Sequence, residues 1–171
     1  MKILRENIQW KTLIFIVSLL ATDVRASVLY VNSQLASVEN GQIWETAFQK
    51  IQPAIDAAAS GDEIWVAEGI YRESLQLRDG VSLFGGFSGT ETNHSQRNWN
   101  LHPTTLDGGN TNRVVTVPAL SIPTRLDGFV LQNGLADYGA GIYAAGGEFI
   151  SANNLMTKNN GNGIFGGSGV L

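Results

Sequence analysis

The feature that most constrains this chain is an internal repeat in its carboxyl-terminal half. The segment 129–134 (FVLQNG) can be laid on 155–160 (LMTKNN) at an offset of 26 residues, and 141–143 (GIY) on 163–165 (GIF) at an offset of 22. A two-part unit therefore recurs with a period in the low twenties, and each copy is too short to bury a hydrophobic face alone. Such a repeat predicts a solenoid whose coils stack at the ~4.8 Å spacing of β-strands and share one core.

Short apolar segments of period two, punctuated by glycine, run from residue 64 onward, and no helical stretch separates them. A β-sandwich would also supply short strands, but it does not need register-matched glycines and asparagines, so the solenoid is favoured. In the solenoid, Asn133 and Asn159 are expected at equivalent turns, where they would hydrogen-bond from coil to coil. The expected strands are 28–31, 64–67, 74–77, 81–84, 105–106, 114–117, 126–131, 141–143, 155–157 and 163–165.

One amphipathic helix is expected before the coils. Between residues 44 and 59, apolar side chains recur at spacings of three and four. Pro53 would break a helix that began much earlier, so we expect the helix to begin near Lys50, with the proline in its first turn, and to end at 60–62 (SGD). Its apolar face is expected to cover the open end of the first coil. That face consists of Ile51, Ala54, Ile55 and Ala58.

The first 26 residues have the three parts of a secretory signal peptide. Basic residues precede the apolar run 13–20 (LIFIVSLL), and Val24-Arg25-Ala26 resembles a signal-peptidase site. Eight apolar residues give about 12 Å of helix, far less than the ~30 Å hydrocarbon core of a bilayer, so a membrane anchor is disfavoured. We therefore expect cleavage after Ala26, a mature chain without a transmembrane segment, and a secreted, extracellular or outer-membrane surface location.

The composition excludes several classes of function. The 171 residues include no cysteine, which excludes a disulfide framework, a thiolate zinc site and a cysteine nucleophile. The signal segment holds four of the 11 basic and two of the 15 acidic residues, so the remainder has 7 basic and 13 acidic residues and a net charge of −6. That charge excludes nucleic-acid binding through a general basic field.

Three stretches carry a resemblance to a known superfamily. Residues 51–71 (IQPAIDAAASGDEIWVAEGIY) resemble the N-terminal segment of right-handed parallel β-helix proteins of the pectin-lyase-like superfamily. Residues 81–91 (VSLFGGFSGTE) and 126–129 (LDGF) look like its bacterial surface-exposed branch, which contains long secreted or outer-membrane, adhesin-like proteins. The resemblance covers about residues 28–171. It implies an all-β, right-handed parallel β-helix with an N-terminal capping α-helix.

Three regions are expected on this basis. Residues 1–26 form the signal peptide, 27–63 an N-terminal strand and the capping helix, and 64–171 the coils, with a loop insertion at about 88–103. The chain stops at Leu171 without a polar or helical cap. Because a bare solenoid end exposes apolar surface and unpaired strand edges, continuation of the same β-helix beyond Leu171 is expected.

Arg125 and Asp127 are the nearest match to catalytic residues. The superfamily includes pectate lyases, which the resemblance implies would need calcium held by clustered carboxylates and an arginine or lysine as base. Arg125 and Asp127 lie two apart on one strand face, and Asp107 of the related LDGG motif is a third candidate. The alternative is structural: aspartate before glycine commonly caps a turn, and an exposed Arg125–Asp127 ion pair is worth under ~1 kcal/mol.

The polar segment 89–103 contains both histidines, His94 and His102. With acidic residues they could ligate zinc, but they lie eight apart and lack the four-residue spacing of a helical two-histidine site. We expect exposed loop histidines and no metal site. Arg97 and Trp99 lie in the same segment. Trp99 could stack on a sugar, although packing back over the coil is favoured.

Two functional classes remain open. The first is a non-catalytic secreted or cell-surface β-helix module, structural or adhesin-like, whose partner is a polysaccharide or a host or cell-surface ligand. The second is a calcium-dependent polysaccharide lyase. An acidic chain would need bound calcium to attract the polyanion pectate, and calcium is expected as a cofactor only in that case. The lack of a clear catalytic constellation favours the first class.

Overall fold

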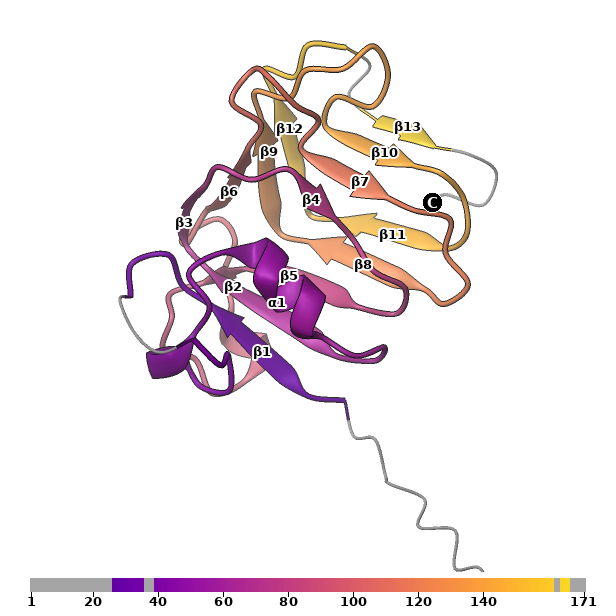
Figure 1. Ribbon diagram of the computed structural model, residues 1–171. Helices are drawn as coiled ribbons and strands as arrows, with labels where there is room; N and C mark the ends of the chain where they lie inside the picture. The colour runs from indigo at the N-terminus through magenta and orange to yellow at the C-terminus, as the bar shows by residue number, and fades with distance from the viewer. Residues whose placement is uncertain (1–25, 36–38, 162–163, 167–171) are drawn as a thin grey trace, which may run out of the picture.

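Strands stack in three parallel sheets along the structure, a computed structural model that describes residues 26–35, 39–161 and 164–166 (Figure 1). Sheet A contains, in spatial order, β1 (Val28–Val31), β2 (Glu63–Ala67), β5 (Ser82–Phe87), β8 (Thr124–Asp127) and β11 (Phe149–Ala152). Sheet B contains β3 (Gly69–Tyr71), β6 (Thr104–Asp107), β9 (Phe129–Gln132) and β12 (Leu155–Thr157). Sheet C contains β4 (Leu75–Gln76), β7 (Val115–Val117), β10 (Ile142–Ala144) and β13 (Ile164–Gly166).

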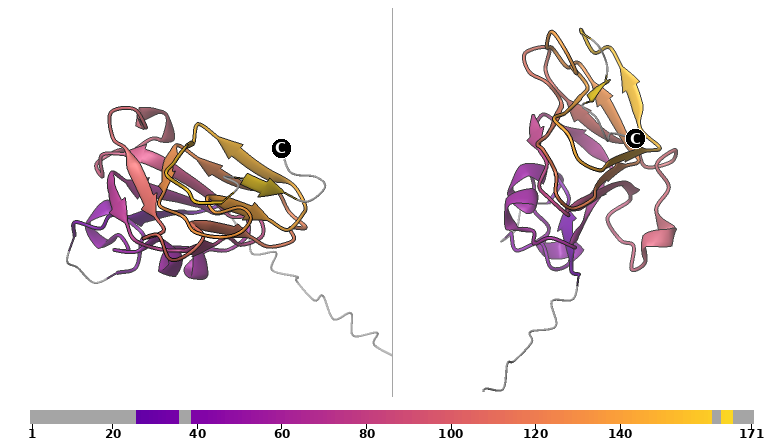
Figure 2. Two further views of the ribbon diagram at one scale, coloured as in Figure 1. Left: turned by 90° about the horizontal axis from the view of Figure 1, so that it is seen from above. Right: turned by 90° about the vertical axis from the view of Figure 1, so that its right-hand side faces the viewer.

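Each coil contributes one strand to each sheet. Coil 1 is β2-β3-β4, coil 2 is β5-β6-β7, coil 3 is β8-β9-β10 and coil 4 is β11-β12-β13, while β1 pairs with β2 ahead of the first coil. All strand pairs in the described part of the chain are parallel. Figure 2 shows the strands winding around a common interior. The predicted parallel β-helix with one helix near its amino end is confirmed.

The core consists of inward-facing side chains that line up from coil to coil. Period-two alternation sends one set of residues on each strand inward, and the parallel register then stacks equivalent positions on one another. Each fully buried aliphatic side chain stabilises the fold by about 1.5–3 kcal/mol. The stacked rows are Ile64, Leu83 and Leu126 in sheet A, Tyr71, Leu106 and Leu131 in sheet B, and Leu75, Val115 and Ile142 in sheet C.

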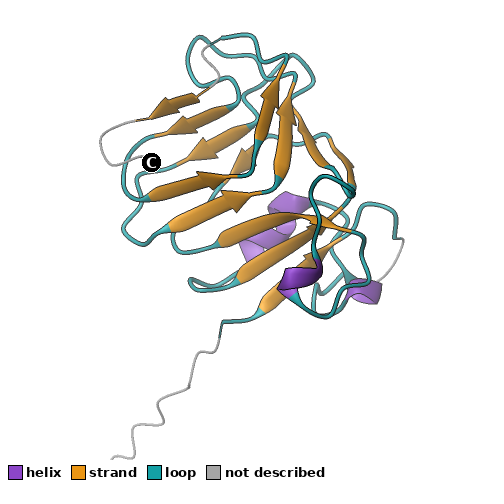
Figure 3. Cartoon of the chain, turned by 180° about the vertical axis from the view of Figure 1, so that it is seen from behind, coloured by secondary structure: helices purple, strands orange, loops and turns teal. Residues whose placement is uncertain are grey.

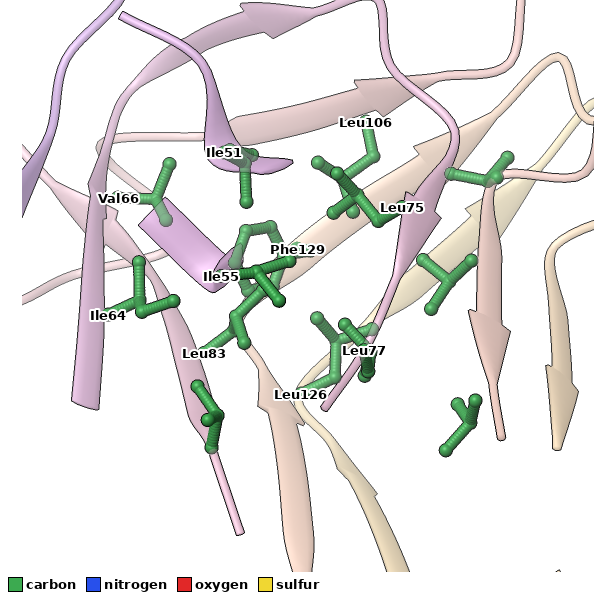
Figure 4. Close-up of a cluster of buried hydrophobic side chains, with 14 of the residues drawn as sticks. Ile51, Ile55, Ile64, Val66, Leu75, Leu77, Leu83, Leu106, Leu126 and Phe129 are labelled. Carbon is green, nitrogen blue, oxygen red and sulfur yellow. The ribbon is translucent and has the colours of Figure 1, made fainter. Parts of the chain in front are cut away.

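The α-helix α1 (Ile51–Ala57) closes the amino end of this core. It begins one residue after Lys50 with Pro53 in its first turn, as predicted, and it ends at Ala57, ahead of the predicted stop at 60–62. Ile51 and Ile55 are fully buried, and Figure 4 shows them directed toward core residues such as Phe129.

Two charged side chains of coil 1 hold the two ends of α1. The Glu73 carboxylate accepts hydrogen bonds from the backbone N–H groups of Ile51 (2.9 Å) and Gln52 (3.0 Å) at the helix amino end. Arg78 donates to backbone carbonyls at the carboxyl end, including that of Asp56 at 2.7 Å. An acid at the amino end and a base at the carboxyl end also match the helix dipole.

Three strand assignments differ from the sequence expectation. The predicted strand 126–131 is two strands, β8 and β9, because Gly128 adopts a φ of +83° and turns the chain between sheets A and B. β3 and β11 were not predicted. β3 is three residues long with Ile70 exposed at its centre, and only Phe149 is buried in β11, so both patterns are weak.

The repeat register differs from the sequence alignment by one residue. The offset of 22 between β10 and β13 is confirmed, but Leu155 pairs with Val130, an offset of 25 instead of 26. Sheet A has the same offset of 25, because Phe149 pairs with Thr124, so Phe129 is equivalent to Asn154. A shift of one residue exchanges the two faces of a strand, so Leu155 points outward and is 60% exposed while Met156 packs against the core.

Asparagines do link the coils, and Asn133 and Asn159 lie in equivalent turns, after β9 and after β12, but at positions one residue out of register. Asn133 is equivalent to Lys158, and both have φ of 54°. The Asn159 side chain accepts from Gly134 N–H (2.8 Å) and donates to the carbonyl of Leu131 (3.0 Å). The Asn154 side chain makes the same pair of bonds, to Phe129 N–H (2.9 Å) and Leu126 carbonyl (2.8 Å), at identical separations along the chain.

Candidate functional site

The outer face of sheet A carries a row of aromatic and charged side chains. Strand register places Tyr30, Trp65, Phe84 and Asp127 side by side on neighbouring strands. Their strand neighbours, such as Leu83 on β5, face the core. Alternation along each strand therefore separates an aliphatic interior from an aromatic and charged exterior.

An aromatic cluster covers the amino-terminal half of this outer face. It consists of Trp44, Trp65, Ala67, Phe84 and Phe87, with Val28 and Tyr30 packed against it. The Trp65 and Phe87 rings are stacked with centroids 4.7 Å apart, and Trp44 Nε1 donates to the carbonyl of Glu91 at 2.8 Å. Figure 3 shows the two 3-10 helices, η1 (Trp44–Thr46) and η2 (His94–Gln96), on the side of the sheet opposite α1.

The segment 88–103, which joins β5 to β6, covers the rest of this face. It is held in shape by a capping box in which Asn93 accepts from Ser95 N–H and Gln96 accepts from Asn93 N–H. It also approaches the coil very closely: a Cβ atom at residue 86 would lie 2.7 Å from the backbone nitrogen of Trp99, and Gly86 removes that clash. The expectation that Trp99 packs over the coil is confirmed, and the Arg97 guanidinium lies 4.9 Å from its ring centroid.

His94 does not lie exposed in a loop, and that expectation is wrong. Its ring meets Phe84 edge-to-face at 4.5 Å and Trp65 at 5.8 Å between ring centroids. Its Nε2 atom is buried and has no hydrogen-bond partner among the residues that the structure describes. Burial lowers the pKa of His94, as does the positive charge of Arg97. His102 lies elsewhere, with its Nδ1 3.0 Å from a carboxylate oxygen of Glu68.

Asp127 is the centre of an ion-pair network on this face. Its side chain is 1% exposed, and Arg97, itself 8% exposed, contacts Oδ1 at 2.8 Å. Asn153 donates to the same oxygen at 2.9 Å, and Arg125 places Nε at 2.9 Å and Nη2 at 2.7 Å from Oδ2. The expected Arg125–Asp127 pair is therefore present, but the carboxylate is buried and shared with a second arginine.

This network leaves Asp127 little capacity for chemistry. A carboxylate has about four acceptor positions, and four nitrogen atoms already occupy the neighbourhood of its two oxygens. Burial alone would raise the pKa of Asp127, but the hydrogen bonds from Asn153, Arg97 and Arg125 outweigh it and hold the pKa below the usual value. A buried, fully bonded carboxylate is suited to anchoring segment 88–103 to the coil.

Asp107 is not brought together with Arg125 and Asp127. Asp107 ends β6 in sheet B and pairs with Gln132 at the end of β9, whereas Asp127 ends β8 in sheet A, just before the start of β9. The length of β9 therefore separates the two aspartates. Asp107 Oδ1 accepts from Gly109 N–H (2.9 Å) and Asn133 (3.0 Å), and its Oδ2 accepts from Gln132 (3.1 Å). These bonds lower the pKa of Asp107 although burial opposes them. The turn-capping alternative is the one observed.

In the described part of the chain, histidine and carboxylate side chains are not clustered as a calcium or zinc site would require. Within residues 26–35, 39–161 and 164–166, no three His, Asp or Glu side chains are grouped so that they could hold a metal ion. No helix in the same ranges is long and apolar enough to span a bilayer. The predicted signal peptide lies outside the described residues.

Sequence reasoning did not find Arg97, Asn153 or Asn154 as members of this network. Arg97 reaches Asp127 across 30 positions of the chain, and no local pattern encodes that contact. The pair Asn153-Asn154 does carry a signal, because an asparagine at the corner before a strand is typical of left-handed backbone, and Asn153 has a φ of 53°.

Three parallel sheets with strands stepping in threes define this chain as a parallel β-solenoid. Comparisons with protein-family models, with curated proteins and with solved structures find no significant match to it.

Proposed function

We propose that the chain is an exported, non-catalytic β-helix module that acts at or beyond the cell surface, in a structural or adhesin-like role. Its partner would be a polysaccharide or another cell-surface ligand. The sequence resemblance to the surface-exposed branch of the pectin-lyase-like superfamily and the signal-like residues 1–26 support this proposal.

The observation that carries the proposal is the state of Asp127. Of the three candidate catalytic residues, Asp107 lies apart, and Asp127 has both oxygens bonded to Arg97, Arg125 and Asn153. Two nitrogen atoms of the Arg125 guanidinium, Nε and Nη2, contact the carboxylate of Asp127. Arg125 is therefore not positioned as a free base. These contacts support the fold, and none of them leaves Asp127 or Arg125 free for catalysis.

A pectate cleavage assay tests this proposal. With polygalacturonate and added calcium, we expect no absorbance increase from an unsaturated product, under conditions in which a pectate lyase gives one. The parent chain and Arg125→Ala should behave alike. A robust increase in the parent that disappears in Arg125→Ala would overturn the proposal and favour the polysaccharide lyase.

A further inference from the structure

A cleft of about 320 Å3 opens where segment 88–103 meets coils 3 and 4. This volume is at the lower end of the ~300–1,000 Å3 typical of small-molecule sites. None of its lining residues is charged. They are Trp99, Asn100, Pro103, Gly128, Phe129, Val130, Asn153, Asn154 and Leu155.

The apolar part of the cleft comes from an indole ring and a strip of aliphatic side chains. Trp44 and Trp65 are buried, whereas Trp99 is partly exposed, and the Arg97 guanidinium lies 4.9 Å from the Trp99 ring centroid. Val130 and Leu155 are paired across strands β9 and β12 and face outward, with Leu155 60% exposed. Arg97 is fixed in turn by Asp127, so the indole has a rigid support.

The polar part of the cleft is made of side-chain amides. Asn154 is fully engaged with the backbone of coil 3. Asn153 uses its amide nitrogen on Asp127, and within the described residues its Oδ1 and the Asn100 side chain have no hydrogen-bond partner. An indole beside unpaired amide groups offers an apolar platform edged by neutral donors and acceptors.

We propose that this cleft binds a neutral sugar ring of a polysaccharide, an inference that rests on the proposed ligand-binding function and names its ligand class. The C–H face of a pyranose is apolar and suits Trp99 and Leu155, while its hydroxyl groups suit Asn100 and Asn153. A uronate would bring a carboxylate that needs a cation, and the nearby Arg97 and Arg125 are already bonded to Asp127. The cleft therefore selects neutral sugars over galacturonate.

Tryptophan fluorescence titration tests the inference, because Trp99 is partly exposed and lines the cleft. The probes are neutral hexasaccharides of gluco, manno, galacto and xylo configuration, with hexagalacturonate as the acidic comparator. We expect a saturable emission change with at least one neutral hexasaccharide below about 10 mM, and none with hexagalacturonate.

Two exposed cleft residues give variants that keep the fold, each with a matched control outside the cleft. Asn100→Ala and Leu155→Ala should each weaken binding about fivefold or more, the effect of about 1 kcal/mol. Asn160→Ala and Ile70→Ala, also at exposed positions, should bind like the parent.

Three results would overturn the inference: a panel without saturable binding, hexagalacturonate binding at least as tightly as the neutral probes, or cleft variants that bind like their controls. A failure here is distinguishable from failure of the proposed function. If pectate is cleaved, the proposed non-catalytic role is wrong. If pectate is not cleaved and no hexasaccharide binds, only the proposed sugar site in the cleft is wrong.

Discussion

At the scale of single residues, Arg97 and His94 determine how segment 88–103 sits on sheet A. The Arg97 guanidinium lies between the rings of Phe84 (5.1 Å) and Trp99 (4.9 Å) and bonds to the buried Asp127. His94 inserts a ring among aromatic side chains, where its neutral form is favoured because charging it would require desolvating a cation. Glu63 and Asp127 raise its pKa, but burial, Arg97 and Arg125 outweigh them.

The low pKa of His94 predicts loss of stability in mild acid. The unfolded chain takes up the proton near the ordinary value of 6.5, whereas the folded chain does so only at lower pH. The stability that the neutral His94 ring contributes is fully present when the pH is above 6.5. This contribution is lost as the pH falls through 6.5 toward the pKa of the folded state. We expect urea denaturation to show this decline between about pH 7.5 and 5.5, and His94→Phe to remove most of it.

His102→Gln is the control, since His102 lies outside the aromatic cluster, beside Glu68. It should leave the decline in place. A decline of the same size in His94→Phe as in the parent would show that the buried ring does not control the docking of segment 88–103.

At the scale of elements, α1 depends on coil 1 for its stability. Seven residues are too few for an isolated helix to persist in water, so packing and capping must hold it. Its inward face supplies Ile51, Ala54 and Ile55 to the core, and Glu73 and Arg78 bind its two ends. Because both clamps come from the chain that follows the helix, α1 and the first coil are expected to form together.

Glu73→Gln should loosen this clamp. An amide has one acceptor oxygen in place of two, so one of the N–H groups of Ile51 and Gln52 loses its partner, and the favourable charge at the helix amino end is removed. We expect a loss of about 1 kcal/mol in the free energy of unfolding, measured by urea denaturation. Glu148→Gln, at an exposed position, is the control. Equal stability of the two variants would contradict the clamp.

At the scale of the whole molecule, the coils are joined by their common core and by side-chain amides that cross from one coil to the next. Asn154 and Asn159 of coil 4 each accept from a backbone N–H and donate to a backbone carbonyl of coil 3. Breaking either link leaves polar backbone groups without partners, which costs roughly 1–3 kcal/mol when they are buried.

Hydrogen exchange can detect these two links separately. Asn154→Ala should accelerate exchange of the Phe129 amide and leave the Gly134 amide protected, and Asn159→Ala should do the reverse. Each variant is thus the control for the other, and Asn160→Ala should affect neither amide. Uniform acceleration in both variants would mean that coil 4 opens as one unit, without local links.

The sequence was most informative where a pattern repeats locally. The period of the strands, the start of α1 just before Pro53 and the turn at Asp107 all follow from residues close together in the chain. The outer face of sheet A was not predictable in this way, because His94 and Arg97 find their partners far away in the sequence. The one-residue error in register arose because the letters of 129–134 and 155–160 match at an offset of 26, whereas the strands pair at an offset of 25.

The chain between strands varies far more than the strands do. Sixteen residues join β5 to β6, whereas one residue joins β8 to β9 and two join β11 to β12, yet the three strand pairs stack in the same sheets. A corner faces away from the core, so lengthening it adds no volume inside. Natural variation or protein engineering can therefore exchange a whole corner segment, and with it the shape of a surface cleft, without repacking the interior.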